Sequence, residues 1–215
     1  MKPAKERVAG IIRALRGEYP GAKTTLSHKS AFELLISTIL SAQCTDARVN
    51  KITPGLFRKH KNPGAFARVK QGVLEKEIRS TGFYRNKAKN IIAASKKIVK
   101  EFDGKVPETM DTLTSLPGVA RKTANIVLSS SFRKAEGIAV DTHVKRLSGR
   151  IGLSAERDPV KIEKDLMEIV PRGDWLDFNH LLVSHGRKIC SARKPLCAEC
   201  VIKYLCPSVG TGAGP

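Results

Sequence analysis

The segment Leu116-Pro117-Gly118-Val119-Ala120-Arg121-Lys122 predicts a helix, a tight hairpin and a second helix. Proline cannot continue the preceding helix, Gly118 can adopt a positive φ without steric cost, and residues 122–128 have the pattern of a new helix. The N–H groups of the turn and of the first helical residues have no partner within the helix, so they can bind an anion. Contacts of this kind hold a nucleic acid backbone without reading its bases.

The composition favours a polyanionic partner. The chain has 215 residues, with 39 Lys and Arg against 20 Asp and Glu, which gives a formal net charge of +19. Nucleic acid binding is typical of such a balance, although ribosomal, membrane-surface and other basic proteins share it. No apolar run reaches the roughly 18 residues of a membrane span, and the charged N-terminus lacks the apolar region of a secretion signal. We expect a cytoplasmic protein.

Apolar residues recur at helical spacing along the whole chain, which predicts an all-α fold. Val8, Ile11, Ile12 and Leu15 follow this spacing near the N-terminus. Ser30 and Glu33 have the spacing of a capping box and begin a segment that is apolar nearly all round, as expected for the central helix of a bundle. Asp158-Pro159 is a typical start of another helix. We expect on the order of ten helices and little or no sheet.

Four of the five cysteines form the array C-x6-C-x2-C-x5-C near the C-terminus, namely Cys190, Cys197, Cys200 and Cys206. In a cytosolic chain such an array indicates a metal site rather than disulfides. The spacing suits a tetrahedral zinc or a four-iron cluster and does not separate them. Arg193 and Lys194 lie within the array and Arg187 precedes it, so an ordered loop would present a basic edge to DNA; the alternative is an ordinary solvated loop. Cys44 stands apart and is interpreted as a packing residue.

Taken together, the motifs resemble the endonuclease III family of base-excision DNA glycosylases over nearly the whole chain. The matching stretches are Ser41 to Asp46, the hairpin with Arg121 to Ala124, Val140 to Val144, His185 to Arg187, and the cysteine array. Their common order and spacing make the resemblance specific. It implies two helical lobes, with residues 22–133 forming a six-helix barrel that ends in the helix–hairpin–helix. Residues 1–21 and 134–215 would form the second lobe and hold a [4Fe-4S] cluster. The resemblance also implies a nucleoid-associated protein of prokaryotic type that acts as a monomer.

The resemblance also implies an activity and a catalytic pair. Family members bind double-stranded DNA in the cleft between the lobes, remove oxidised pyrimidines, and cleave the resulting abasic site. Lys122 would attack the sugar as a neutral amine and form a Schiff base, and the helix dipole and Arg121 both disfavour its ammonium form. Asp141 would help generate the nucleophile and stabilise positive charge on the sugar. The simpler alternatives are a phosphate-binding lysine and a helix N-cap.

Further residues gain DNA-binding roles through the resemblance. Gln43 would fill the space left by the flipped base, Phe83 would act as a wedge, and Asp46 and His143 would line the pocket. Phe83 could instead be a core residue, and His143 a structural histidine. The remaining contacts lie in the hairpin: Leu116, Gly118, Ala120, Arg121 and Thr123.

Ala120 departs from the family, which usually has glycine at this position. A negative φ there would make the methyl group harmless, whereas a positive φ would strain the hairpin by roughly 1 kcal/mol.

Three rival functions stay open. One is an adenine glycosylase for mispairs, against which Lys122 argues; another is a pyrimidine-dimer glycosylase of the same fold. The third is a non-catalytic DNA-binding module with a structural zinc.

Overall fold

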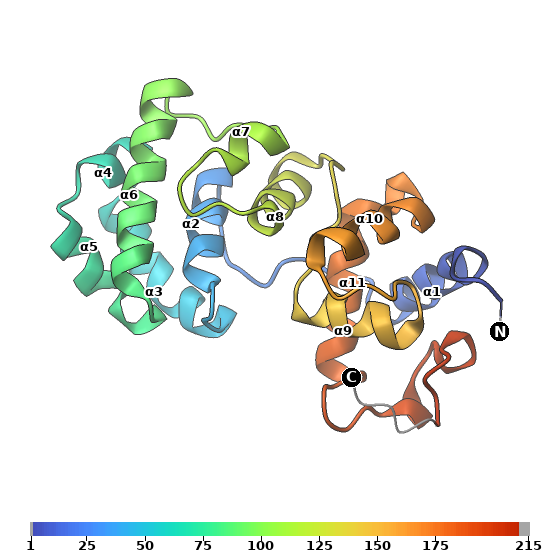
Figure 1. Cartoon of the computed structure of the whole chain (residues 1–215). Coiled ribbons are helices and arrows are strands. Elements are labelled where there is room, and N and C mark those ends of the chain that lie inside the picture. Colours follow the sequence, from blue (N-terminus) through green and yellow to red (C-terminus); the bar gives the residue numbers. More distant parts are fainter. Residues whose placement is uncertain (1, 211–215) are drawn as a thin grey trace. The chain divides into compact units, whose positions relative to one another are not determined.

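The computed structural model describes residues 2–210, which form helices and connecting loops without a strand (Figure 1). The all-α prediction is therefore confirmed. The chain divides into two compact units. We call Thr24–Glu136 the central unit, and Met1–Lys23 with Gly137–Pro215 the terminal unit. Among the described residues, no helix combines the length and the apolar character that a membrane span requires.

The central unit is built around α2 (Ala31–Ser41), which contacts α3, α6 and α8. Its residues Phe32 and Leu34 to Leu40 are all buried, as the apolar sequence predicts for a central helix. The other helices of this unit are α3 (Asp46–Lys59), α4 (Pro63–Arg68), α5 (Gln71–Ile78), α6 (Tyr84–Glu101), α7 (Met110–Thr114) and α8 (Arg121–Phe132). A short 3-10 turn, η1 (Arg79–Thr81), precedes α6.

The start of α2 differs slightly from the predicted capping box. The Ser30 hydroxyl accepts a hydrogen bond from the Glu33 N–H at 3.2 Å, as expected. The Glu33 carboxylate, however, accepts from the N–H of Lys29 at 2.7 Å rather than from that of Ser30. The carboxylate therefore accepts from the N–H of the residue before the N-cap, and this hydrogen bond still fixes the path of the chain into α2.

The terminal unit combines both ends of the chain. Its helices are α1 (Ala4–Glu18), α9 (Thr142–Ile151), α10 (Pro159–Ile169) and α11 (Trp175–Lys188), with the short 3-10 turns η2 (Arg172–Asp174), η3 (Cys197–Glu199) and η4 (Lys203–Leu205). The predicted apolar residues of α1 are buried, and this helix packs against α10 and α11. Asp158 caps α10 by accepting from the N–H groups of Val160 and Lys161, with Pro159 in the first turn, as predicted.

Arg7 joins α1 to the irregular C-terminal segment. Arg7 is only 6% exposed, and its guanidinium donates hydrogen bonds to the carbonyls of Ile151 at 3.0 Å and Gly152 at 3.2 Å, and also to the carbonyl of Leu205. A buried guanidinium is stable only where carbonyl or carboxylate oxygens surround it. The C-terminal segment thus depends on α1 for its place in the terminal unit.

Candidate active site and cysteine centre

The hairpin between α7 and α8 has the conformation that its sequence predicts. Gly118 has φ +78°, and a Cβ at this position would lie 2.8 Å from the Cβ of Asn90. Glycine is therefore required both by the backbone angle and by the packing against α6. Leu116 and Val119 are 2% and 6% exposed and anchor the turn in the core. Any DNA contact at Leu116 is thus limited to its backbone.

Ala120 is the N-cap residue of α8 and has φ −88° and ψ 167°. Because φ is negative, the methyl group causes no left-handed strain, and the possibility of a strained hairpin is excluded. Alanine also has no side-chain oxygen, so α8 begins without a side-chain cap. A helix that begins in this way offers the positive end of its dipole to an anion.

Lys122 is the second residue of α8 and is exposed, as is Arg121, whereas Thr123 is half-buried. The predicted placement of Lys122 in the first turn of a helix is confirmed. Its amine therefore lies directly after the hairpin, within reach of whatever anion the helix start binds.

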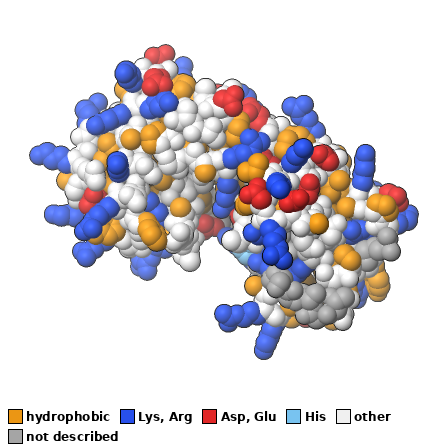
Figure 2. Space-filling model, in the orientation of Figure 1, with side chains coloured by type: hydrophobic (Ala, Val, Ile, Leu, Met, Phe, Trp, Pro, Cys, Tyr) orange, Lys and Arg blue, Asp and Glu red, His pale blue; other side chains and the backbone are white. Residues whose placement is uncertain are grey.

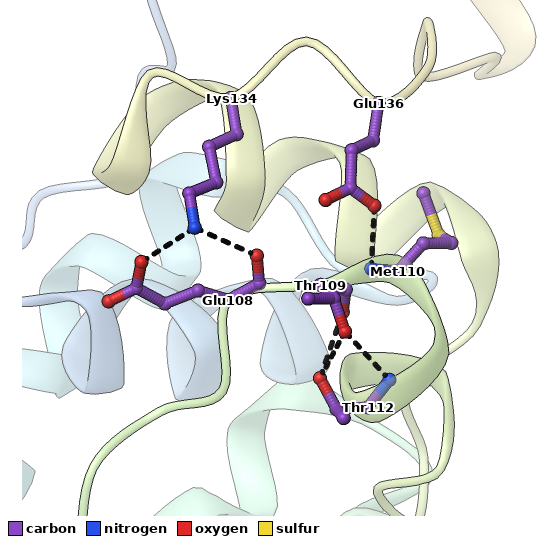
Figure 3. Close-up of polar contacts among 6 residues, drawn as sticks. All are labelled: Glu108, Thr109, Met110, Thr112, Lys134 and Glu136. Atoms are coloured by element: carbon purple, nitrogen blue, oxygen red, sulfur yellow. Dashed lines mark hydrogen bonds and ion pairs between the residues drawn. The ribbon is translucent and has the colours of Figure 1, made fainter.

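A set of polar contacts ties the two outer ends of the helix–hairpin–helix together (Figure 3). After α8, the Lys134 ammonium contacts the Glu108 carboxylate at 2.8 Å and its carbonyl at 3.2 Å. The Glu136 carboxylate accepts from the N–H of Met110, the first residue of α7, at 2.8 Å. Thr109 provides the side-chain cap of α7. These contacts hold α7 against the segment that leaves α8, which fixes the hairpin at its base.

Asp141 is the N-cap residue of α9. Its Oδ1 accepts a hydrogen bond from the N–H of Val144 at 2.8 Å, so the capping interpretation is confirmed. Burial lowers the pKa of His180, while the negative charges of Asp177 and Asp141 oppose this shift. Sequence reasoning missed His180, because a histidine among the mixed polar and apolar residues of α11 gives no distinctive pattern. The cap fixes the Asp141 carboxylate at the start of a rigid helix.

His143 follows Asp141 in the first turn of α9 and is half-buried. Its Nδ1 lies 3.1 Å from Nη2 of Arg146, and a Cβ at Gly186 would come within 2.8 Å of the same nitrogen. The ring is therefore held between α9 and α11. This packing supports the structural interpretation of His143 without testing a substrate contact.

The proposed DNA-inserting residues both have left-handed backbone angles. Gln43, just after α2, has φ 52°, and Phe83, at the start of α6, has φ 46°. Phe83 is 65% exposed, so its interpretation as a core residue is wrong. It lines a surface hollow of about 320 Å³ with Tyr84, Arg85 and Asn86. Asp46 lies in the first turn of α3, where its carboxylate accepts a hydrogen bond from Thr25.

The four cysteines of the array are close enough to affect one another. Burial raises the pKa of the Cys200 thiol, and the charges of Cys206, Cys190 and Cys197 raise it further. Burial likewise raises the pKa of Cys206, with Cys190 and Cys197 contributing.

Within residues 2–210, no three His, Cys, Asp or Glu side chains are arranged to hold a single metal ion. Four neighbouring sulfurs are nevertheless the donor set of a [4Fe-4S] cluster, whose iron would stabilise them as thiolates. Cys44 belongs to the central unit and is not part of this set.

Two arginines of α9 bind residues 190–206, which we call the cysteine loop. Arg150 donates to the carbonyls of Ser191 at 2.7 Å and Ala192 at 2.6 Å, and its Nη1 lies 3.6 Å from Sγ of Cys190. Arg146 donates to the Cys190 carbonyl at 3.0 Å. Sequence reasoning missed both residues, because their partners are backbone carbonyls that leave no side-chain pattern in the sequence. The helix that carries Asp141 is thereby fixed to the cysteine centre.

A buried chain of hydrogen bonds reaches Cys200. His185 is 1% exposed, its Nδ1 lies 3.0 Å from the Tyr19 hydroxyl, and its Nε2 lies 3.4 Å from Sγ of Cys200. Burial lowers the pKa of His185 to about 4, so the ring is neutral near pH 7. Burial, with Glu18 and Cys200, raises the pKa of Tyr19 to about 12, so its hydroxyl keeps its proton. Tyr19 can therefore donate to Nδ1, which leaves the Nε2–H to face the sulfur.

The basic residues near the array are exposed. Arg187 lies in the last turn of α11, and Arg193 and Lys194 lie in the cysteine loop, where the Ser191 hydroxyl binds the Lys194 carbonyl at 2.6 Å. Figure 2 shows Lys and Arg side chains projecting from the visible surface of both units. The loop is ordered, as the predicted basic edge requires, and its contact with DNA stays a prediction.

Comparison with known proteins identifies the class of protein that this fold and site define. Residues 36–172 match the profile of the HhH-GPD superfamily of base excision DNA repair proteins. Residues 190–206, which span the cysteine array, match the iron–sulfur binding domain of endonuclease III. The chain is thus a helix–hairpin–helix protein of base excision repair with an iron–sulfur centre.

The more detailed comparison gives the family within this class. Endonuclease III of Synechocystis sp. is 52% identical over 97% of this chain and 95% of its own length. Endonuclease III of Bacillus subtilis is 48% identical over 87% of this chain and 86% of its own length. A solved structure described as a trapped endonuclease III–DNA covalent intermediate superposes with a TM-score of 0.90 at 41% identity, covering 95% of this chain and 96% of the other. The chain belongs to the endonuclease III family. Its cofactor is accordingly a [4Fe-4S] cluster, and the zinc alternative is set aside.

Proposed function

We propose that the protein is a bifunctional DNA glycosylase that removes oxidised pyrimidines from duplex DNA and cleaves the abasic site by β-elimination. The observation that carries this proposal is Lys122, an exposed amine in the first turn of α8, directly after a hairpin suited to bind phosphate. Membership of the endonuclease III family supports the glycosylase and lyase activities. The covalent DNA complex described for a member of that family supports a nucleophilic residue in place of a water molecule.

The chemistry follows from an amine that attacks C1′ of the damaged nucleotide. As Nζ of Lys122 forms a bond to C1′, the bond from C1′ to the base breaks, and the base leaves with the electron pair and takes up a proton. The sugar ring then opens as its C1′–O4′ bond breaks, which gives an imine between Nζ and C1′. The imine acidifies the C2′ proton, whose removal expels the 3′ phosphate, and water finally hydrolyses the imine.

Asp141 contributes the negative charge that this reaction needs. As the base departs, the sugar gains positive charge, which a fixed carboxylate stabilises without having to reorient. The carboxylate can also accept the proton that the lysine must lose before it attacks. Since the cap to Val144 holds Asp141 in place, the residue combines a structural and a chemical role.

The base must leave the stack before Lys122 can reach C1′. We infer that Gln43 fills the vacated space and that Phe83 separates the neighbouring bases, because both are exposed at turns of the central unit. Asp46 and His143 would then line the pocket for the base. The hairpin residues Gly118, Ala120, Arg121 and Thr123 would hold the phosphate, and Arg187, Arg193 and Lys194 would add basic contacts.

The cysteines Cys190, Cys197, Cys200 and Cys206 would hold the [4Fe-4S] cluster, which when bound supplies iron–thiolate bonds that crosslink the loop. The reaction at C1′ uses no metal. Arg150 and His185 lie against two of these sulfurs and orient them. We also infer a cytoplasmic location, because the closely similar relatives are bacterial enzymes that act on DNA.

Borohydride trapping tests the proposal. Borohydride reduces the imine and leaves the protein covalently attached to DNA, so wild-type protein should form an adduct on duplexes with thymine glycol, dihydrouracil or an abasic site. Lys122→Ala should form none, while Lys96→Ala, at an exposed lysine of α6, controls for the loss of one charge and should behave like wild type. An adduct that persists in Lys122→Ala would exclude this nucleophile. Duplexes with uracil or a pyrimidine dimer, run alongside, decide whether the substrate is instead a mispair or a dimer.

A further inference from the structure

Lys87 is a buried lysine in the central unit that the proposed chemistry does not use. It lies in the first turn of α6 and is 5% exposed. Its Nζ donates hydrogen bonds to two carbonyls, those of Leu40 and Thr81, each at 2.8 Å. Burial lowers the pKa of Lys87, because an ammonium group in the core loses its hydration. Because Lys87 is buried, solubility does not explain why a charged residue stands at this position.

The two carbonyls belong to the two segments that carry the proposed DNA-inserting residues. Leu40 lies in the last turn of α2, just before Gln43. Thr81 ends η1, just before Gly82 and Phe83. Both are C-terminal carbonyls, which carry partial negative charge and attract a cation. A single ammonium group therefore joins the end of α2 to the turn before α6.

The backbone of Lys87 holds the same turn from its other side. The N–H of Lys87 donates to the carbonyl of Phe83 at 3.1 Å, while its side chain binds the carbonyl of Thr81. The hydroxyl of Thr81 binds the carbonyl of Ile78 at 2.8 Å, which secures the start of the turn. The turn between Thr81 and Phe83 is thus closed by Lys87 at both ends.

The two segments need such support, because both contain strained residues. Gln43 and Phe83 have φ 52° and 46°, in the left-handed region that glycine favours. At Phe83 the conformation is also unusual for its place, since residues at a helix N-cap are ordinarily extended. Strained residues of this kind persist only where the surrounding structure holds them.

We propose that Lys87 is a positioning residue that couples the Gln43 loop to the Phe83 turn, so that the side chains of Gln43 and Phe83 enter the DNA stack together. The inference rests on the proposed function, because it is there that Gln43 and Phe83 are assigned to the stack. The role of Lys87 is to lower the cost of opening the damaged base pair. It does not contribute to the reaction at C1′.

Two substrates separate base-pair opening from chemistry. One duplex carries thymine glycol paired with adenine, and the other carries it within a short bubble of mismatched bases, where little opening is needed. In single-turnover assays, Lys87→Met should lose about tenfold in the rate constant of base release on the paired duplex and stay within about twofold of wild type on the bubble. Lys96→Met, which removes the same charge from an exposed position of α6, should behave like wild type on both. An equal loss of activity on the two duplexes, or no loss on the paired one, would overturn the proposal.

Two more variants keep the test decisive if Lys87→Met does not fold. Lys87→Arg retains the charge and the donors and should recover most of the rate on the paired duplex. Lys87→Gln retains a shorter, neutral donor and should show faster hydrogen exchange at residues 42–46 and 81–84 together, with residues 115–120 unchanged. Faster exchange in only one of the two segments would contradict the coupling. Failure of the proposed function is a separate result, because wild-type protein would then form no borohydride adduct on abasic DNA.

Discussion

Helices α8 and α9 each begin beside one of the two proposed catalytic residues, yet they begin in different ways. Ala120 starts α8 and supplies no side-chain cap, whereas Asp141 starts α9 and caps it through a 2.8 Å hydrogen bond to Val144. The α8 terminus is therefore suited to receive an external anion, and the α9 terminus already has an internal one. The comparison shows how the same helical dipole can serve phosphate binding in one place and carboxylate positioning in the other.

The two helices also differ in what holds them. The hairpin before α8 is braced within the central unit by the contacts of Glu108 and Glu136 with Lys134 and Met110. Helix α9 is braced by Arg146 and Arg150, which bind carbonyls of the cysteine loop. The position of Lys122 therefore rests on contacts within the central unit, while that of Asp141 rests in part on the cysteine loop.

Substitution of Asp141 gives the largest expected effect. Asp141→Asn keeps a good N-cap and should retain DNA binding, but it should lose base release by roughly 10²–10³-fold because the negative charge is gone. Asp141→Ala should lose as much activity and, in addition, about 1 kcal/mol of stability with the cap. Single-turnover base release and urea unfolding measure the two effects. Full base release by Asp141→Asn would reduce Asp141 to a cap.

Loss of the cluster should affect the two helices unequally. Cys197→Ser removes one of the proposed cluster ligands, so the protein should lose most of its visible absorbance, and hydrogen exchange in α9 should rise on the order of a hundredfold. Exchange in α8 should change little, because the contacts that brace it lie in the central unit. A matched Cys44→Ser variant, at the cysteine outside the array, should keep the cluster. Equal acceleration in α8 and α9 would refute the difference in their support.

Gly118→Ala should destabilise the hairpin by about 2 kcal/mol, because alanine at positive φ is strained and its Cβ would also meet Asn90. The matched control is Gly104→Ala, with φ +74° and no atom within 4 Å of the added Cβ. That variant should show the backbone strain alone, about 1 kcal/mol. Urea unfolding compares the two, and equal losses would mean that the contact with Asn90 adds nothing.

Ala120→Asp would convert the start of α8 into that of α9. The extended backbone at Ala120 suits a capping residue, so the variant should gain about 1 kcal/mol in stability. The new carboxylate would compete with phosphate, and DNA affinity should fall up to about tenfold. Ala120→Ser should give a similar gain in stability with a smaller loss of affinity. Unchanged DNA binding by Ala120→Asp, measured by titration at fixed salt, would show that phosphate does not bind at this terminus.

Much of the fold was predictable because local sequence determines it. The apolar run of α2, the cap at Asp158 and the break at Pro117-Gly118 are each specified by a few neighbouring residues. The negative φ at Ala120 was one of two outcomes that sequence left open, since alanine is compatible with either side of the hairpin.

The residues that sequence reasoning missed act through long-range contacts with the backbone. Lys87 lies 47 positions from Leu40, and Arg150 lies 41 positions from Ser191. Their partners are carbonyl oxygens, which every residue has, so no side-chain pattern reveals the pairing. In sequence, each resembles one of the many solvated cations of a basic chain. Only the folded arrangement shows that these ammonium and guanidinium groups are buried.

The discontinuous terminal unit has a consequence for the order in which the protein is made. Helix α1 precedes the central unit in the chain, but its buried residues Val8, Ile11, Ile12 and Leu15 pack in a cluster whose other buried members, apart from Tyr19, follow residue 137. The central unit is one continuous segment and can fold while the rest is being synthesised. Arg7 can complete its hydrogen bonds only after its partner Leu205, 198 positions further along the chain, has been synthesised. Assembly of the terminal unit, and insertion of its iron, is therefore a late event that follows translation of the cysteine loop.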